Sequence, residues 1–272
     1  MTIEGIQPPA KGESRPYSHL CANRLQSKFI ILFISSEHRS QLSFRSADPL
    51  QTNIMRAQWV KDLYFNAIQP VARLNHWRWQ WQLKQGIPTQ FPSPLHLNLG
   101  SGANPVKGFV NIEGVAQRHK EMWLDLRNGL PFPDNTVDGI FTCHVFEHFY
   151  MPELAPLVKD CHRVLKPGGT LRILVPSVDK AIAAYVNQDP SFFSPFPRAY
   201  KSMGGKLYNF LLCEGQHRII FDFSLMEEIL LYSGFHTVEE KAGGESHLFR
   251  PEVLEQMEEG YAGISLMVEA QK

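Results

Sequence analysis

The chain has 272 residues, of which 43% are hydrophobic and 20% are charged, and this length suits one full α/β domain with an accessory segment. The formal net charge at pH 7 is zero, and residues 91–272 carry 16 basic and 22 acidic side chains, which disfavours a bulky nucleic acid as a partner. The longest apolar run, Phe29–Ile34, is far too short to cross a membrane and has no signal-peptide cleavage pattern, so we predict a soluble protein.

Residues 1–53 mix proline, serine, glutamine and charged side chains without sustained periodicity, which predicts a poorly ordered N-terminal segment. Met55 opens the first convincing helix. One hypothesis is therefore that the start codon was assigned too far upstream and that residues 1–54 are not part of the native protein. An N-terminal peptide of the native protein that begins before Met55 would exclude this hypothesis.

Residues 54–90 form a basic, aromatic-rich accessory segment. Apolar residues recur at helical spacing over 54–74, and Pro70 is expected to kink or split that helix. Three tryptophans follow at alternate positions over 77–81, with arginine and glutamine between them. One interpretation is a helix packed on the main domain with half-buried tryptophans. The alternative is a membrane-interface or glycan-contacting patch, with peripheral membrane contact through residues 55–85.

A proline-punctuated linker ends near Pro94, and strand and helix patterns then alternate through the third unit, residues 91–272. This alternation predicts a Rossmann-like, doubly wound α/β fold, with a mostly parallel seven-stranded sheet, helices on both faces and ligands at the carboxyl ends of the strands. Residues 100–108 are too few for a crossover helix, so a loop is expected there. The predicted strands are 95–99, 109–113, 121–124, 137–142, 170–175, 235–241 and 263–270, and the predicted helices are 152–165, 178–187, 199–212 and 223–233.

The stretch LHLNLGSGANPVKGFVNIE, residues 95–113, indicates a binding site for a nucleotide-like ligand. An apolar strand ends in Gly100-Ser101-Gly102, and the next strand ends in Glu113. The two glycines let the backbone approach a ligand closely, and a carboxylate at the neighbouring strand tip can hold two ribose hydroxyls. A dinucleotide fits poorly, because Pro105 replaces the third glycine of G-x-G-x-x-G and Glu113 follows much sooner than expected.

Three further segments follow in order: Asp125-Leu126, then LPFPDNTVDGIFTCHVFEHF over 130–149, then RVLKPGGTLRILVP over 163–176. Together with the glycine motif, they resemble the class I S-adenosylmethionine (SAM)-dependent methyltransferases. The pattern is most similar to predicted methyltransferases that carry LNLGSG…LPFPD…HVLEH. The resemblance is strong over residues 95–176 and implies SAM as the cofactor.

The resemblance also implies roles for individual residues. Gly100 and Gly102 would line the methionine portion of SAM, and Glu113 would accept the ribose hydroxyls. Asp125 would accept a hydrogen bond from the adenine amino group, since hydroxyls and exocyclic amines are donors that need fixed acceptors. The remaining cofactor contacts that it implies are Leu126 on the adenine ring, with Asn98, Ser101 and Cys143.

The segment Thr142–His148 leaves the fourth strand and is expected to overhang the methyl group. A hydroxyl acceptor must lose its proton, and histidine is the commonest side chain for that task. His148 and His144 are the candidates for a catalytic base. The alternative is that His148 packs structurally at the start of the next helix and His144 flanks the cofactor without taking part in the chemistry.

Residues 177–222 have no counterpart in a minimal domain of this kind and are predicted to form a substrate cap that excludes water. His217 and Arg218 near its end are candidate acceptor contacts, or they brace the cap against the sheet. The predicted function is methyl transfer to a small-molecule or glycan-like acceptor, most simply at a hydroxyl. The alternative is a non-catalytic SAM-binding or interaction protein.

The cysteines and the overall composition complete these predictions. Cys21, Cys143, Cys161 and Cys213 are far apart and form no CxxC pair. Their spacing predicts neither a disulfide framework nor a zinc site, no metal ligand is predicted elsewhere in the chain, and the spacing favours the reducing cytoplasm. Nothing in the sequence indicates an oligomeric state.

Overall fold

The computed structural model describes residues 58–102, 105–115 and 121–272. The predicted poorly ordered segment, residues 1–53, and the Met55 start-site hypothesis lie outside the described residues. Within the described part, no helix combines the length and apolar character needed to cross a membrane.

Seven strands form one sheet in the order β3-β2-β1-β4-β5-β7-β6, and only the pairs made by β7 are antiparallel. The order reverses between β1 and β4, which is where ligands bind in doubly wound sheets. The predicted fold class is confirmed. The strands are β1 (His96–Leu99), β2 (Val110–Glu113), β3 (Met122–Trp123), β4 (Val137–Cys143), β5 (Leu165–Pro176), β6 (Thr237–Glu240) and β7 (Ser265–Gln271).

The two faces of the sheet carry separate apolar clusters, because side chains alternate along each strand. In β5, Leu171 and Ile173 pack in the larger cluster, whereas Leu174 packs in the smaller one. Residues of α5 and α8 cover the first face, and residues of α9 cover the second. The helices of this domain are α5 (Met151–Val164), α6 (Val178–Val186), α7 (Met203–Leu212), α8 (Phe223–Tyr232) and α9 (Pro251–Glu258).

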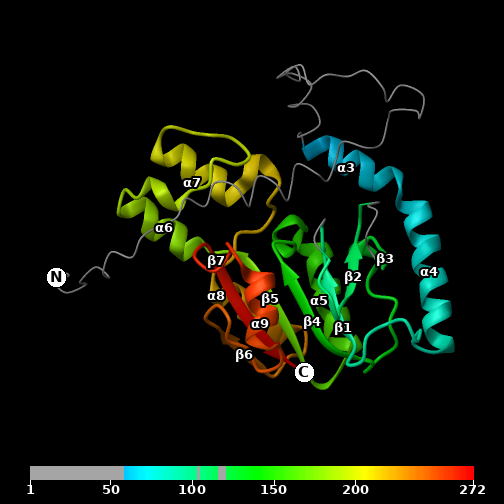
Figure 1. Cartoon of the computed structure of the whole chain (residues 1–272). Coiled ribbons are helices and arrows are strands. Elements are labelled where there is room, and N and C mark those ends of the chain that lie inside the picture. Colours follow the sequence, from blue (N-terminus) through cyan, green and yellow to red (C-terminus); the bar gives the residue numbers. More distant parts are fainter. Residues whose placement is uncertain (1–57, 103–104, 116–120) are drawn as a thin grey trace, which may run out of the picture.

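The carboxyl ends of the parallel strands face helices that do not cover the sheet. In Figure 1, α3, α6 and α7 lie beyond the edge at which β4 and β5 end. Helices α6 and α7 pack on each other through an aromatic cluster that includes Phe193 and Phe210. The insertion predicted as a cap is therefore a small helical unit next to the ligand-binding edge of the sheet.

The accessory segment forms two helices, α3 (Gln58–Ala67) and α4 (Gln69–Gln85). Pro70 lies in the first turn of α4, where a missing N–H costs nothing, so it separates the two helices as predicted. Asn75 donates a hydrogen bond to the carbonyl of Trp123 in β3 (2.6 Å). Helix α4 is thereby attached to the edge of the sheet.

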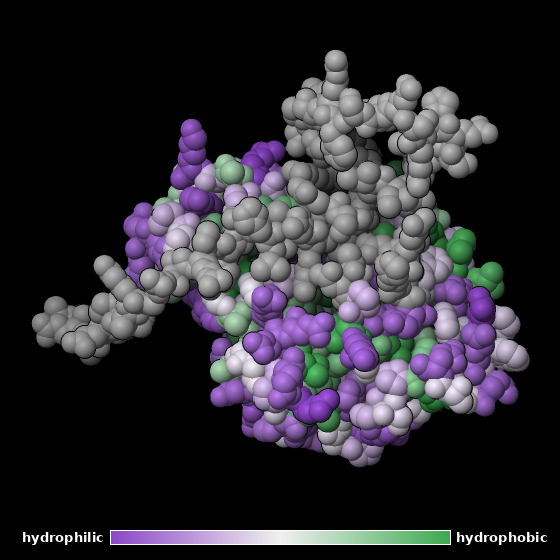
Figure 2. All heavy atoms as spheres, in the orientation of Figure 1, coloured by the Kyte–Doolittle hydropathy of each residue, from purple (hydrophilic) through white to green (hydrophobic). Residues whose placement is uncertain are grey.

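The tryptophans of α4 differ in burial: one packs against the core, and two are exposed at the surface. Trp79 packs against the core beside Phe91, with ring centroids 6.2 Å apart. Trp77 and Trp81 are 63% and 59% exposed. Figure 2 shows apolar residues on the outer edge of the molecule where α4 runs, and Leu74 is among the exposed ones. The packed-helix interpretation holds for one tryptophan, and the other two remain at the surface.

Some boundaries differ from the sequence-based prediction. Helix α9 has only eight residues and begins with a proline, so its periodicity is too short to be recognised. Strand β5 begins at Leu165 and pairs with Val137 before a register shift, so its first residues continue directly from α5. No helix lies in the described part of residues 100–109, which agrees with the loop expected between β1 and β2.

Helix α9 is held to the sheet by a buried ion pair. The Arg172 side chain on β5 is fully buried, and its Nη2 lies 2.7 Å from Oε1 of Glu258 on α9. Glu269 on β7 lies on the other side of the guanidinium, at 3.7 Å from Nη1. An apolar environment makes each carboxylate dependent on this one cation.

We expect Arg172→Met to lower the free energy of unfolding by about 3–5 kcal/mol, because two buried carboxylates lose their cation. The matched control is Arg198→Met, which removes a 2.8 Å pair with Glu214 whose arginine side chain is 55% exposed. That loss should stay below about 1 kcal/mol. Urea denaturation measures both, and equal losses would contradict the assignment of Arg172 to the core.

Candidate active site

A cavity of about 620 Å³ lies at the carboxyl ends of the strands, where the strand order reverses. Its walls come from the loops after β1, β2, β3 and β4, from α3, from the cap and from residues 260–264. Most of the predicted site residues line it. They are Gly100, Ser101, Gly102, Glu113, Asp125, Leu126, Cys143, His144, His148 and His217.

The glycine loop and Glu113 form one preorganised unit. Gly100 and Gly102 have positive φ angles of 67° and 63°, which glycine adopts without strain. The amide N–H of Gly102 donates to Oε2 of Glu113 (2.8 Å), and the amide N–H of Val115 donates to Oε1 (3.1 Å). The carboxylate is therefore fixed at the tip of β2 and still lines the cavity.

Gly100 is also required by its neighbour across the switch point. A Cβ at this position would lie 2.4 Å from Cγ2 of Val145, which follows β4. A side chain would push apart the loop after β1 and the segment after β4. The close approach of these two segments closes the floor of the cavity.

Asp125 is held by protein donors on both oxygens. Its Oδ1 accepts hydrogen bonds from the backbone N–H and the Nε–H of Arg127, and its Oδ2 accepts from Nη2 of the same guanidinium (2.6 Å). Gln69 of α4 also donates to Oδ2. A carboxylate offers about four acceptor positions, so an adenine amino group would share an acceptor that Arg127 and Gln69 already use.

Helix α3 supplies a wall of the cavity that sequence patterns do not reveal. Asp62, Phe65 and Asn66 line the cavity. The Arg127 guanidinium donates to the carbonyl of Phe65 (3.0 Å) and lies over its ring, 5.2 Å from the centroid. The accessory segment is thus part of the site, and its contribution depends on tertiary contacts that no local motif encodes.

The segment after β4 places a buried carboxylate among histidines. The Glu147 side chain is 1% exposed, and its Oε1 lies 3.3 Å from Nδ1 of His144 and 3.9 Å from Nε2 of His148. Burial alone would raise the pKa of Glu147, but the contact with His144 and the charges of His148, His144 and His217 hold it at about 2. Glu147 is therefore ionised at neutral pH.

Each histidine is fixed by a second partner. His144 Nε2 lies 2.8 Å from the hydroxyl of Ser265. His148 Nδ1 donates to the carbonyl of Gln216 (2.9 Å), and His217 Nδ1 donates to the carbonyl of Leu211 (2.9 Å), since a carbonyl oxygen can only accept. The rings of His148 and His217 meet edge to face, 5.1 Å between centroids.

Two predicted site residues do not line the cavity. Asn98 is buried and donates to the amide oxygen of Asn111 (2.9 Å), so it joins β1 to β2. Arg218 pairs with Asp62 (3.0 Å), and its guanidinium lies 4.6 Å from the ring centroid of Tyr150. For Arg218, the bracing role is the one that these contacts support.

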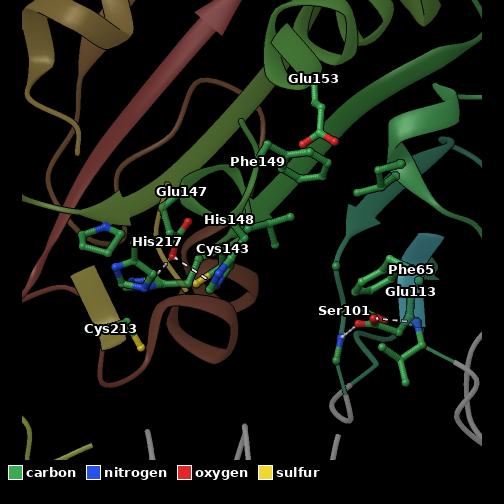
Figure 3. Close-up of a pocket in the computed structure, with 18 of the residues that line it drawn as sticks. Phe65, Ser101, Glu113, Cys143, Glu147, His148, Phe149, Glu153, Cys213 and His217 are labelled. Atoms are coloured by element: carbon green, nitrogen blue, oxygen red, sulfur yellow. Dashed lines mark hydrogen bonds and ion pairs between the residues drawn. The ribbon is translucent and has the colours of Figure 1, made fainter. Parts of the chain in front are cut away.

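The residues that sequence reasoning missed are chiefly Glu147 and the residues of α3 that line the cavity. Glu147 lies between the two candidate bases in HVFEH. The sequence does not distinguish it from a solvent-exposed acid, because its burial is known only from the structure. In Figure 3, Glu147, His148, His217, Cys143 and Cys213 gather on one side of the cavity, and Ser101 and Glu113 lie on the other. The cap side chains that line the cavity are Phe192, Ser194, Phe196, Asn209, Phe210 and Cys213.

Comparisons with known proteins bear on this geometry. Residues 112–173 match the family model described as a methyltransferase domain. A probable S-adenosylmethionine-dependent methyltransferase of Mycolicibacterium smegmatis is 38% identical over 58 residues. These matches support a class I SAM-dependent methyltransferase. They confirm the resemblance predicted from the sequence and support SAM as the cofactor. The aligned part covers 20% of this chain and 22% of that relative.

Solved structures of methyltransferases are more distantly similar. A SAM-dependent methyltransferase of Thermotoga maritima, a possible histamine N-methyltransferase, has a TM-score of 0.43 and 15% identity, over 81% of this chain and 99% of its own. The 1,6-didemethyltoxoflavin-N1-methyltransferase of Burkholderia thailandensis has a TM-score of 0.38 and 15% identity, over 85% and 93%. Similarity at this level indicates no acceptor.

We expect Gly100→Ala to lower the free energy of unfolding by at least about 1–2 kcal/mol, because φ is positive and the new methyl group meets Val145. Gly204→Ala in α7 is the control. It has open space around the position and replaces glycine within a helix, so it should leave stability equal or slightly higher. Chemical denaturation tests both variants. A Gly100→Ala protein as stable as the wild type would contradict the close approach of Gly100 and Val145.

Proposed function

We propose that this protein transfers the methyl group of SAM to a small-molecule or glycan-like acceptor, at a hydroxyl oxygen, and releases S-adenosylhomocysteine. The observation that carries the proposal is the single cavity shared by the glycine loop with Glu113 and by the histidine-lined segment after β4. A volume of about 620 Å³ lies within the usual range for small-molecule sites. Cofactor and acceptor groups can therefore meet in one enclosed space.

The cofactor half of the proposal uses residues that are already fixed. Glu113 is held by two backbone N–H groups and keeps lone pairs for the two ribose hydroxyls. The positive φ angles of Gly100 and Gly102 expose the loop backbone to the methionine portion. Asp125 and Leu126 mark the adenine end, where Phe65 of α3 adds an aromatic wall.

The acceptor half uses the cap and the histidines. Phe192, Phe196 and Phe210 line the cavity and exclude water, which favours a reaction that disperses the sulfonium charge. His148 and His144 are the proposed bases for a hydroxyl proton. His148 donates through Nδ1 to the carbonyl of Gln216, so its neutral form carries the lone pair on Nε2, toward Glu147.

The wider setting remains part of the proposal. The division into residues 1–53, 54–90 and 91–272, a cytoplasmic location and peripheral membrane contact through residues 55–85 are predictions. The exposed Trp77 and Trp81 support the membrane contact. Co-sedimentation with anionic vesicles at low salt tests it, and no binding there would count against it.

Glu113→Gln should weaken binding of S-adenosylhomocysteine by roughly tenfold to a hundredfold, because hydrogen bonds to a charged acceptor contribute about 1.5–3 kcal/mol. Isothermal titration calorimetry measures the affinity. Glu255→Gln, at an exposed position of α9, is the control and should bind as the wild type does. Equal affinities for all three proteins would remove Glu113 from the cofactor site.

Labelled SAM and the wild-type protein, added to a native cell extract, should yield a small or glycan-like product whose label resists mild alkali, as a methyl ether does. The Glu113→Gln protein should give less product at limiting SAM. Label released by alkali would point to a carboxyl acceptor instead. If S-adenosylhomocysteine binds but no extract or acceptor panel yields product, the non-catalytic alternative is favoured.

A further inference from the structure

A cluster of potential metal ligands lies on the acceptor side of the cavity. One ligand atom each of Glu147, His148 and His217 lies within 4.8 Å of the others. Glu147 and His148 belong to a 3₁₀ turn (Phe146–His148) after β4, whereas His217 follows α7 at the end of the cap. Figure 3 shows the three side chains directed toward one another. Two separate parts of the fold therefore converge on one point.

The Glu147 carboxylate is buried, and its contacts with the neighbouring imidazoles are long. Neither oxygen accepts a hydrogen bond of regular geometry from any residue that the structure describes. Its ion-pair partners in that part of the chain are His144 at 3.3 Å and His148 at 3.9 Å, longer than the 2.7–2.9 Å or so of a charge-assisted hydrogen bond. A buried anion without a close donor calls for a cation beside it.

The imidazoles are oriented as metal ligands are. His148 and His217 each donate their Nδ1–H to a backbone carbonyl, of Gln216 and Leu211. In the neutral ring this fixes the lone pair on Nε2. Histidines that bind metals show the same arrangement, in which the second nitrogen donates to a carbonyl or carboxylate. Three potential ligand atoms thus converge on one point.

We propose that Glu147, His148 and His217 bind a divalent first-row transition metal ion such as Zn²⁺ or Co²⁺. Two imidazoles and one carboxylate suit these ions, whereas Mg²⁺ and Ca²⁺ prefer oxygen ligands. Cys143 and Cys213 line the same cavity, which adds soft sulfur to the surroundings. The cysteine spacing gave no sign of a metal, because the site depends on histidines brought together by the cap.

Three protein ligands leave coordination positions for water and for an acceptor oxygen. If methyl transfer is the function, as proposed above, the ion binds the acceptor hydroxyl and lowers its pKa. The hydroxyl loses its proton to water, its oxygen forms the new C–O bond as the S–C bond breaks, and neutral S-adenosylhomocysteine leaves. His148 then acts as a ligand, and the metal replaces the need for a base.

The test uses tag-free, full-length protein freed of metal with a chelator. Calorimetry with Zn²⁺ and visible absorption with Co²⁺ should both show one tightly bound equivalent, with ligand-field bands for Co²⁺ that an equal concentration of Mg²⁺ does not displace. His217→Gln and Glu147→Gln should each weaken binding at least tenfold. His236→Gln, an exposed histidine outside the cavity, is the control and should change nothing.

Glu147 is buried, and its variant could fail to fold. The variant of the half-buried His217 is therefore the decisive one, and thermal unfolding of the metal-free protein checks that it folds. No tight Zn²⁺ or Co²⁺ binding, or identical binding by His217→Gln, would overturn the metal site. Calorimetry with S-adenosylhomocysteine on the same samples separates the two proposals. Cofactor binding without metal binding leaves the proposed function intact, and metal binding without cofactor binding leaves only the metal site.

Discussion

The site depends on one close approach, between the backbone at Gly100 after β1 and Val145 after β4. These two strands are the neighbours at which the sheet order reverses, and they pair from His96–Gly139 to Leu99–Thr142. Beyond the last pair the chains diverge, one toward Glu113 and the other toward Glu147. The absent side chain at Gly100 lets the glycine loop with Glu113 and the histidine-bearing segment after β4 share one cavity. The contact is local, but it sets the distance between the glycine loop and the segment after β4.

The cap and the accessory helices complete the cavity in different ways. The cap packs mainly through its own aromatic residues and reaches the site through His217, whose Nδ1 donates to a carbonyl within the cap. Helices α3 and α4 also make polar contacts with the sheet domain, through the bond from Arg127 to the carbonyl of Phe65 and the bond from Gln69 to Asp125. Asp125 therefore has a structural task besides any contact with adenine. Its substitution would loosen the α3 wall of the cavity.

Sequence patterns sufficed for those features that are local. The apolar strands, the glycine loop and the acid at the tip of β2 each follow from a few neighbouring residues, and the mostly parallel sheet follows from the alternation of strands with helices. Asn98 does not line the cavity, because its side chain bonds to Asn111, and the sequence does not tell which way a polar residue in that strand faces. Arg218 contacts Asp62 and Tyr150, which are distant in sequence, and these contacts favour the bracing alternative over an acceptor contact.

Glu147 illustrates the limit more sharply. In the sequence it is one acid between two histidines. A solvent-exposed glutamate in the same position would have the same sequence pattern. Folding removes it from water, brings His217 beside it from seventy residues away and commits the Nδ1–H groups of two imidazoles to backbone carbonyls. One ligand atom each of Glu147, His148 and His217 thereby lies within 4.8 Å of the others. The proposed metal ion would bind all three, and no local motif encodes their convergence.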